Sequence, residues 1–581
     1  MAITLTSKYL AELKKGVNRP NVVLELALDS GTVKLGYHNG RAETPNVGYF
    51  SDGTRYADGS IYASGSTASM AIGFSDVIPC LKSVSSLQNK IDTKSGYSTR
   101  GKITAVISGR DNFKNIVANN YLKNRRVTRK DGFVTRDFEY TDYATTFTGT
   151  IQDWSRKGDE LTLTVSDDLV DATIKIPTEN ATKTQYVDYL NMNPVDIMTN
   201  ILSTQLGIAA GYINSEQFTS ERDTWLSSWK FARVITEPAE ADTYLNELQI
   251  ETNSFIVHEG DRISYKVFAP PVPGQSIEEW TDATHILKDT LSVKSGYSGG
   301  FFNRIVAYYD FDESGGDKTD AFESVVIAVD SASQGSAQWD EASTKTIKSK
   351  WIRSFMFSQT ANIGGLKVFH VSSANGAGTG TLTYTDSTNT LTYTPPAGVV
   401  GEAVTLTKDG KYQVFGLDRT KYVRVLITTA GLPASNQSDT VTISPLDAQG
   451  YATVLAMKLL TRYRDPTTSI SMEIDINNVA WNSTFIKPTD LKKITSGEVF
   501  EKGVTGWTQE SVMLTSVNPN FESGRVQVEA IETKLYRRYG FIAPAGYPDY
   551  GSASAAQKER AFIGNANNKV NGGAEDGYCI W

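Results

Sequence analysis

The chain has 581 residues, of which 40% are hydrophobic and 10% aromatic. This composition is too apolar for a disordered chain, and the length corresponds to roughly four domains at about 150 residues each. Because 57 Lys and Arg face 65 Asp and Glu, the net charge is −8, and a surface that attracts nucleic acid as a whole is excluded. No stretch approaches the roughly 20 apolar residues of a membrane span. Met1 to Thr6 does not have the pattern of a secretory signal, so we expect folding in a cytosol.

The N-terminal part is predicted to be mainly β. A short helix over Ser7 to Lys15 comes first, because apolar residues recur there at helical spacing. Runs typical of strands follow, bounded by turn residues. These runs are Val22 to Leu28, Thr32 to Tyr37, Gly101 to Ser108, Phe147 to Ile151 and Leu161 to Val165.

Helical spacing returns after residue 193. An Asn-Pro start signal precedes an apolar stripe that begins at Val195, and a second helix is predicted over Ala239 to Glu251. This helix leads into a hairpin with strands at Ser254 to His258 and Arg262 to Val267. The middle of the chain is therefore predicted to be an α+β unit.

The stretch from Ile363 to Thr405 carries few charges and many threonines in alternating runs. Such runs, separated by turns, are typical of a small β-sandwich. A strand over Lys348 to Phe357 and a helix over Ala448 to Arg462 flank it and continue the α+β style. We therefore expect the sandwich to be an insertion into a loop, where added length costs little.

The predicted fold class is mainly β with α+β parts and an inserted β-sandwich. The predicted domains are 1–177, mainly β; 178–362, α+β; 363–444, an inserted Ig-like sandwich; 445–543, α+β and β, completing the core; and 544–581, an extended tail.

The usual motifs of catalysis and metal binding are not found. The four histidines are far apart, the two cysteines are 499 residues apart, and no phosphate-binding loop or dinucleotide fingerprint occurs. Gly296 to Gly300 matches Gly-x-Ser-x-Gly, but a strand rather than a helix is predicted to follow, so it is interpreted as a turn. Asp310 to Asp317 resembles the start of a calcium loop, yet Ala321 stands where an EF-hand needs glutamate. No catalytic residue, cofactor or metal is predicted.

Two sets of charged residues remain as candidates. The acids near predicted strand ends could include a glycosidase pair, but turn and strand-exit roles are the favoured interpretation; they are Asp153, Glu160, Asp167 and Asp168. The basic cluster follows a short predicted helix and is interpreted as an exposed loop that faces a partner, with a solvated loop or a nucleic-acid contact as alternatives. It consists of Lys123, Arg125, Arg126, Arg129 and Lys130.

Several stretches, taken in order, resemble the tail-tip (baseplate) hub proteins of long flexible-tailed bacteriophages and of related gene transfer agents. The resemblance covers most of the chain outside the predicted sandwich. The stretches are Val77 to Ile107, Phe147 to Leu169 (FTGTIQDWSRKGDELTLTVSDDL), Tyr244 to Pro271 (YLNELQIETNSFIVHEGDRISYKVFAPP), Phe301 to Asp310, Tyr451 to Pro466 (YATVLAMKLLTRYRDP), and Arg537 to Trp581.

This resemblance implies a multidomain hub with β-barrel-like and α+β domains, present as a homotrimer at the virion tail tip and assembled in the bacterial cytoplasm. Such a hub closes the tail tube and contacts the distal tail protein, the tape-measure protein and a central fibre or receptor-binding protein. DNA passes through it without specific recognition. The alternative is a tail-tip adhesin or carbohydrate-active enzyme, whose sandwich would stack sugar rings on exposed tyrosines. The candidate tyrosines are Tyr384, Tyr393, Tyr412 and Tyr422.

Overall fold

The computed structural model describes most of the chain between residues 5 and 533. The described ranges are 5–15, 18–38, 77–85, 89–91, 101–135, 137–177, 186–269, 276–294, 301–312, 319–334, 343–359, 361–407, 410–428, 430–464, 466–475, 486–500, 505–520, 525–533, 569–570 and 575–576. Of the predicted tail, only a two-stranded pair is described, β33 (Lys569–Val570) with β34 (Glu575–Asp576).

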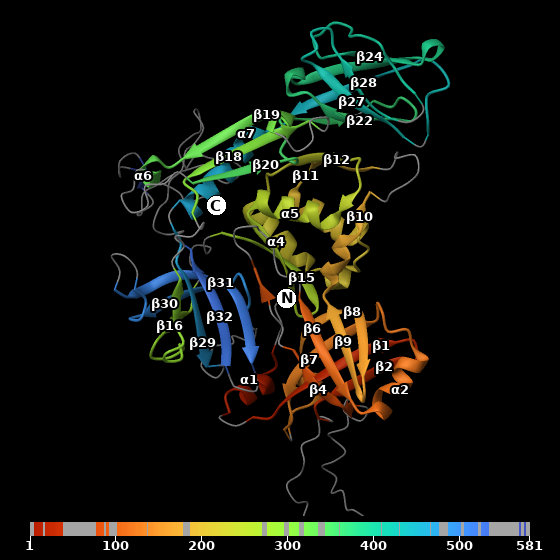
Figure 1. Ribbon diagram of the computed structural model, residues 1–581. Helices are drawn as coiled ribbons and strands as arrows, with labels where there is room; N and C mark the ends of the chain where they lie inside the picture. The colour runs from red at the N-terminus through yellow and green to blue at the C-terminus, as the bar shows by residue number, and fades with distance from the viewer. Residues whose placement is uncertain are drawn as a thin grey trace, which may run out of the picture.

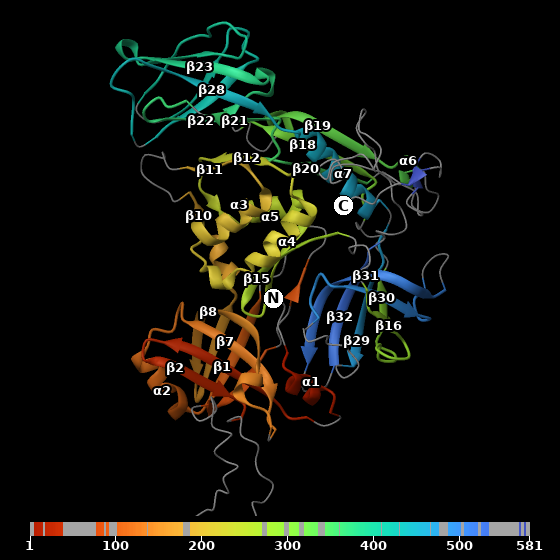
Figure 2. The ribbon, with the colours of Figure 1, turned by 180° about the vertical axis from the view of Figure 1, so that it is seen from behind.

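The molecule consists of several separate sheets with helices packed between them (Figures 1 and 2). Two sheets lie side by side at the lower end, a helical layer lies above them, and a sandwich forms the upper end. The predicted fold class, mainly β with α+β parts and a β-sandwich, is confirmed.

The N-terminal sheet has eight strands in the order β3-β2-β1-β7-β8-β9-β6-β4. Its two edge strands, β3 and β4, are separated in the chain by Cys80 alone, so the sheet curls back on itself. Within the described residues no ladder joins β3 to β4, and the curl is therefore barrel-like rather than a closed ring of hydrogen bonds. The strands are β1 (Pro20–Leu28), β2 (Gly31–Gly36), β3 (Val77–Pro79), β4 (Leu81–Val84), β6 (Lys102–Ser108), β7 (Arg126–Phe133), β8 (Ala144–Lys157) and β9 (Glu160–Ser166).

Alternation along these strands fills the inside of the curl. Ile103, Ala105 and Ile107 of β6 are fully buried, as their spacing predicts, and helix α2 (Arg110–Asn119) adds Phe113 and Ile116 to the same core. The β8–β9 hairpin turns at Gly158, whose φ of 60° lies in the left-handed region that glycine adopts readily.

A second sheet combines strands from distant parts of the chain. Its order is β16-β30-β31-β32-β29-β17, and β5 also pairs with β31. Helix α1 (Ser7–Leu13), capped by the Thr6 side chain, contributes Tyr9 and Leu13 to a buried cluster that this sheet shares with Phe133 and Phe138 of the N-terminal part. The strands are β5 (Asn89–Lys90), β16 (Glu279–Thr281), β17 (Ser292–Lys294), β29 (Ser469–Asp475), β30 (Leu491–Ser496), β31 (Trp507–Asn520) and β32 (Arg525–Glu532).

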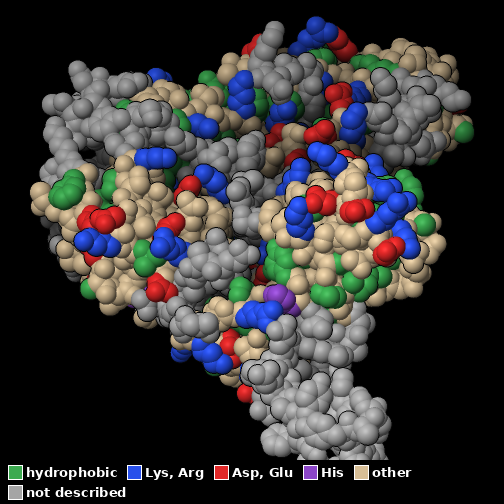
Figure 3. Space-filling model, turned by 60° about the horizontal axis from the view of Figure 1, so that its bottom comes forward, with side chains coloured by type: hydrophobic (Ala, Val, Ile, Leu, Met, Phe, Trp, Pro, Cys, Tyr) green, Lys and Arg blue, Asp and Glu red, His purple; other side chains and the backbone are tan. Residues whose placement is uncertain are grey.

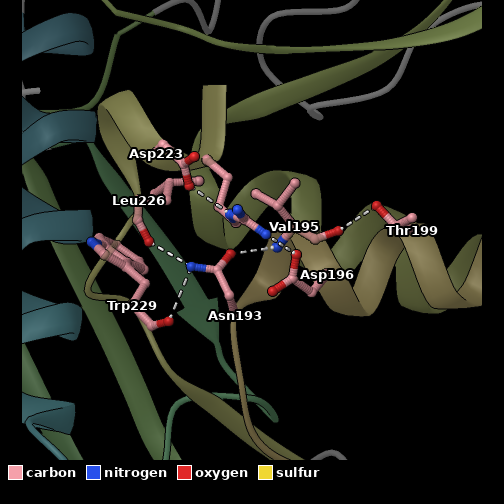
Figure 4. A network of polar contacts seen from close by, with 8 residues as sticks. Asn193, Val195, Asp196, Thr199, Asp223, Leu226 and Trp229 are labelled. Carbon is pink, nitrogen blue, oxygen red and sulfur yellow. Dashed lines mark hydrogen bonds and ion pairs between the residues drawn. The ribbon is translucent and has the colours of Figure 1, made fainter. Parts of the chain in front are cut away.

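The helical layer contains α3, α4 and α5 together with three short β pairs. Asn193 caps the start of α3 by accepting the Val195 N–H at 2.9 Å, and its amide donates to the carbonyls of Leu226 and Trp229 (Figure 4). One side chain thus attaches the start of α3 to the end of α4. The elements are α3 (Pro194–Asn200), a π-helical turn (Ile201–Gln205), α4 (Ser215–Trp225), α5 (Ala241–Thr252), β10 (Lys175–Ile176) with β13 (Ala239–Glu240), β11 (Val187–Met192) with β12 (Phe231–Ile235), and β14 (Ser254–Glu259) with β15 (Arg262–Val267).

A three-stranded sheet and the helix α7 (Ala448–Tyr463) complete this layer. The strand order is β19-β18-β20, with β18 (Arg304–Phe311), β19 (Phe322–Val329) and β20 (Thr344–Lys348); α6 (Ser331–Gln334) follows β19. Tyr451 of α7 stacks on Trp229 with ring centroids 5.1 Å apart, and Tyr189 and Tyr244 contact Trp351. We call these buried side chains the aromatic core.

The predicted strand over Lys348 to Phe357 is wrong as a single element. It divides into β20 and β21 (Phe355–Gln359), with a turn between them. The Ser349 hydroxyl accepts the N–H groups of Trp351 and Ile352 at 3.2 and 2.9 Å. Such side-chain hydrogen bonds to the backbone compete with the hydrogen bonds between strands, so the strand is interrupted here. Trp351 is therefore held in the aromatic core, where its indole N–H donates to Glu247 at 2.9 Å.

The sandwich packs a five-stranded sheet, β21-β28-β23-β24-β25, on a three-stranded one, β22-β27-β26. Leu382, Tyr384, Leu391 and Tyr393 fill its core. β21 lies before residue 363, where the predicted sandwich begins, and pairs with β28. The strands are β22 (Leu366–Val371), β23 (Gly378–Thr385), β24 (Thr390–Thr394), β25 (Val404–Thr405), β26 (Lys411–Phe415), β27 (Tyr422–Ile427) and β28 (Gln437–Pro445).

Polar contacts hold the sandwich to the three-stranded sheet. Arg424 pairs with Asp312, and the Tyr422 hydroxyl donates to Asp312 and Glu323 at 2.9 and 2.8 Å. The chain enters and leaves the sandwich at one point, because the Leu446 N–H donates to the Ser354 carbonyl at 2.7 Å.

We predict that replacing residues 355–445 by two or three glycines leaves the remaining chain folded, since its ends already lie within hydrogen-bond distance. Thermal unfolding and circular dichroism measure this. A matched excision that joins Thr360 to Pro445 keeps β21 but removes most of its partner strand β28. This second chain is expected to be less stable than the first. Aggregation of both excised chains would contradict the insertion model.

A second prediction concerns Glu251 of α5, which is buried and accepts the Ser349 hydroxyl at 2.6 Å. Burial raises the pKa of Glu251 well above its ordinary 4.5. Above pH 4.5 the unfolded chain releases this proton while the folded chain keeps it, so stability falls by about 1.4 kcal/mol per pH unit until the folded pKa is passed.

The variant Glu251→Gln has no ionisable group at this position. Its unfolding free energy in urea, measured from pH 4 to pH 8 against the parent chain, is expected to exceed the parent's by a margin that grows with pH. Parallel pH profiles for the two chains would refute the assignment.

Candidate functional site: the basic cluster and the acidic groups

The basic cluster is not a loop. β7 begins at Arg126, so Arg126, Arg129 and Lys130 lie on a central strand of the curled sheet, between β1 and β8. Lys123 and Arg125 lie in the short turn before it. The prediction of one exposed basic loop is therefore wrong, because pairing with β1 and β8 converts most of it into strand.

Arg129 is buried within its own chain, with 8% of its surface exposed. Its guanidinium binds both carboxylate oxygens of Asp131 at 2.9 Å and donates to the Ser85 carbonyl at 2.8 Å. Burial alone would lower the pKa of Arg129, but the Asp131 carboxylate raises it overall. Arg129 is therefore a structural cation, and the predicted partner-facing role is wrong for this residue.

Arg126 connects the curled sheet to the helical layer. Both its terminal nitrogens donate to Asp168 at 2.8 Å, and its guanidinium lies 3.4 Å from the ring centroid of Tyr212. Bidentate pairing and stacking on an aromatic face are the two interactions for which arginine is best suited. The Asp168 pair orients the guanidinium, and the stacking on Tyr212 is the contact that joins the curled sheet to the helical layer.

Of the other three basic residues, Lys123 is exposed, and Arg125 and Lys130 are half-buried. Lys130 lies 3.4 Å from Glu25 and 4.5 Å from the ring centroid of Tyr140. Arg125 pairs with Asp29, and Lys123 is exposed beside Tyr121, which is 71% exposed. Figure 3, which looks onto the lower end of the molecule, shows basic and acidic side chains mixed over this region. Lys82 and Glu160 form one of the local ion pairs of the curled sheet.

The four candidate acids have different environments. Asp153 is exposed and accepts the N–H of Trp154, and Glu160 pairs with Lys82. Asp167 is fully buried and accepts the N–H groups of Gly101 and Leu169. Both carboxylate oxygens of Asp168 accept hydrogen bonds from Arg126. The turn and strand-exit interpretation accounts for these contacts.

His258 is a member of this junction that sequence reasoning missed. Its Nε2 lies 4.0 Å from Asp168 Oδ2, and its ring contacts Phe147 with centroids 5.7 Å apart. Next to it, Gly260 forms an isolated bridge with Phe147, so the β14–β15 turn packs directly on β8. No local motif marks this histidine, because its neighbours come from strands about 100 residues away.

The remaining candidates fall outside the described residues or inside the core. Gly296 to Gly300 and residues 313–318 of the acidic loop are outside the described residues, whereas Asp310 binds Ser354 and Asp312 binds the sandwich. Tyr384, Tyr393 and Tyr422 are buried and Tyr412 is half-buried, as expected for core and edge residues. The described part of the chain holds no group of three or more His, Cys, Asp or Glu that could bind a metal, and no helix in it is long and apolar enough to cross a membrane.

We predict that Arg126→Met, which keeps the aliphatic stem but removes the charge, lowers the unfolding free energy by about 2 to 4 kcal/mol, because Asp168 is left buried and unpaired. The control Lys123→Met, at an exposed position three residues away, is expected to change it by less than about 0.5 kcal/mol. Urea unfolding measures both. Equal effects of the two substitutions would contradict the structural role of Arg126.

Comparison with known proteins gives loose structural likenesses. No protein-family model matches the sequence, and no curated protein matches it. The 43 kDa tail protein of prophage MuSo2 from Shewanella oneidensis is similar with a TM-score of 0.36 and 10% identity, over 78% of this chain and 95% of that chain. The virion of a native gene transfer agent particle gives a TM-score of 0.19 and 15% identity, over 32% of this chain and 52% of that chain.

Proposed function

We propose that this chain is a structural hub protein of a bacteriophage tail tip. Three copies form a ring around the tail axis, close the tail tube and open for DNA at infection. The distal tail protein, the tape-measure protein and a central fibre or receptor-binding protein are the proposed neighbours.

The observation that carries this proposal is that stretches resembling hub proteins contact one another in the fold. Phe147 to Leu169 contains the β8–β9 hairpin, and Tyr244 to Pro271 contains α5, β14 and β15. These two stretches meet at the bridge between Phe147 and Gly260. Phe301 to Asp310 and Tyr451 to Pro466 contain β18 and α7, which share one buried core with Tyr244. Four of the six stretches that resemble hub proteins thus lie in one connected part of the described fold, which supports a scaffold.

The alternative, a carbohydrate-active enzyme or adhesin, has less support. A glycosidase needs two carboxyl groups about 5 to 9 Å apart across a substrate. Asp167 and Asp168 are instead buried against amides and Arg126. The sandwich tyrosines proposed for sugar stacking are largely buried. The absence of enzymatic activity stays a prediction.

The part of the basic cluster that remains available for a partner is the turn with Lys123 and Arg125. Tyr121 adds an exposed aromatic ring to the same turn. We propose that this corner faces a neighbouring tail protein.

Ring symmetry tests the proposed function. A reconstruction of intact tail tips without imposed symmetry is expected to show three copies of this chain around the axis, because a closed ring caps a tube without leaving open edges. One copy or six copies per tip would refute the three-fold hub.

A further inference from the structure

Strand β19 is an open edge of the three-stranded sheet. It pairs antiparallel with β18, and in the part of the chain that the structure describes no strand pairs with its other side. Figures 1 and 2 show β19 along the outside of the upper body. An edge of this kind presents a row of backbone N–H and C=O groups to which another strand can pair.

The outer face of β19 is apolar. Val325, Ile327 and Val329, at alternate positions, are 46%, 52% and 47% exposed. On the same face of β18, the neighbours of Val325 and Ile327 are Tyr308 and Val306. Farther from the edge, β20 places Thr344, Thr346 and Lys348 opposite Arg304, Val306 and Tyr308. The apolar surface is therefore concentrated at the open edge.

β19 also lacks the usual features that protect an edge. Soluble proteins discourage edge pairing with lysine, proline, bulges or very short strands. The eight residues FESVVIAV contain no lysine or proline, and the register with β18 is unbroken from Arg304 to Phe311, with only the pair Asp310 and Glu323 missing from the ladder. Their single charge, Glu323, is engaged by Ser373 and Tyr422 of the sandwich.

We propose that β19 pairs with β19 of a second copy of this chain, antiparallel and about a two-fold axis at Ile327. This register places Ile327 opposite itself and Val325 opposite Val329 of the other copy. The paired segment, Val325 to Val329, carries no charged residue, so no like charges oppose each other, and apolar pairs of this kind stabilise antiparallel strands.

The strand is thus complementary to itself, which is the reason for assigning a second copy as its occupant. The result is a continuous six-stranded sheet. A two-fold contact uses the same surface on both chains and closes on itself, so it covers the edge without leading to fibres. The inference is independent of the three-fold ring, which concerns the chain assembled in a tail.

Disulfide trapping tests the register in the full-length chain carrying Cys579→Ser. Ile327→Cys is expected to form a covalent dimer under mild oxidation, because the two thiols face each other across the axis. Val325→Cys alone is not expected to dimerise, whereas a mixture of Val325→Cys and Val329→Cys chains is. Val399→Cys, at a 64% exposed apolar position on the sandwich, is the matched control for chance collisions.

Sedimentation gives an independent readout. The parent chain is expected to have twice the monomer mass, and Ile327→Lys is expected to have the monomer mass with an unchanged circular dichroism spectrum. If Ile327→Cys cross-links no faster than Val399→Cys, the proposal is wrong. A monomeric parent chain whose incorporation into tails is lost on Ile327→Lys would also overturn it, since the edge would then belong to another tail protein.

Discussion

Burial of the aromatic core is the interaction on which the upper body depends. Trp229, Trp351 and Tyr451 are nearly or fully buried, and they come from three regions of the chain. Each large aromatic side chain removes on the order of 150–250 Å² from water, so this one cluster provides a large share of the apolar burial that holds the helical layer together. The same cluster positions β18, on whose two sides β19 and β20 pair, and the turn from which the sandwich departs.

Much of the secondary structure was predictable because local patterns and tertiary burial agree. The β14–β15 hairpin has turn residues at Glu-Gly-Asp, and α3 starts at an Asn-Pro signal whose asparagine caps the helix. The alternating apolar residues Ile263, Tyr265 and Val267 of β15 are buried, and every residue of β14 is buried. Local preference and global fold then favour the same structure.

The basic segment was misassigned because some of its charged residues are buried in the fold. β7 reads Arg-Val-Thr-Arg-Lys-Asp-Gly-Phe, and its buried Arg129 is compensated by Asp131 two positions along the same strand. A hydrophobicity pattern cannot distinguish such an internal ion pair from a solvated loop. The junction of Arg126, Asp168 and His258 was out of reach for another reason, since its three residues come from separate strands and turns brought together only by the tertiary fold.

Helix α1 has a consequence for synthesis. Tyr9 contacts Phe133 and Phe138. The buried cluster that it shares with Leu13 also contains residues from Ile470 to Ala530, which the ribosome makes more than 450 residues later. At roughly 5–20 residues per second, this later part of the cluster is made on the order of a minute after the helix. Until then α1 can pack only against the N-terminal part of its cluster, which includes Phe133 and Phe138. The second sheet, whose strands extend to Glu532, can form only after most of the chain has been translated.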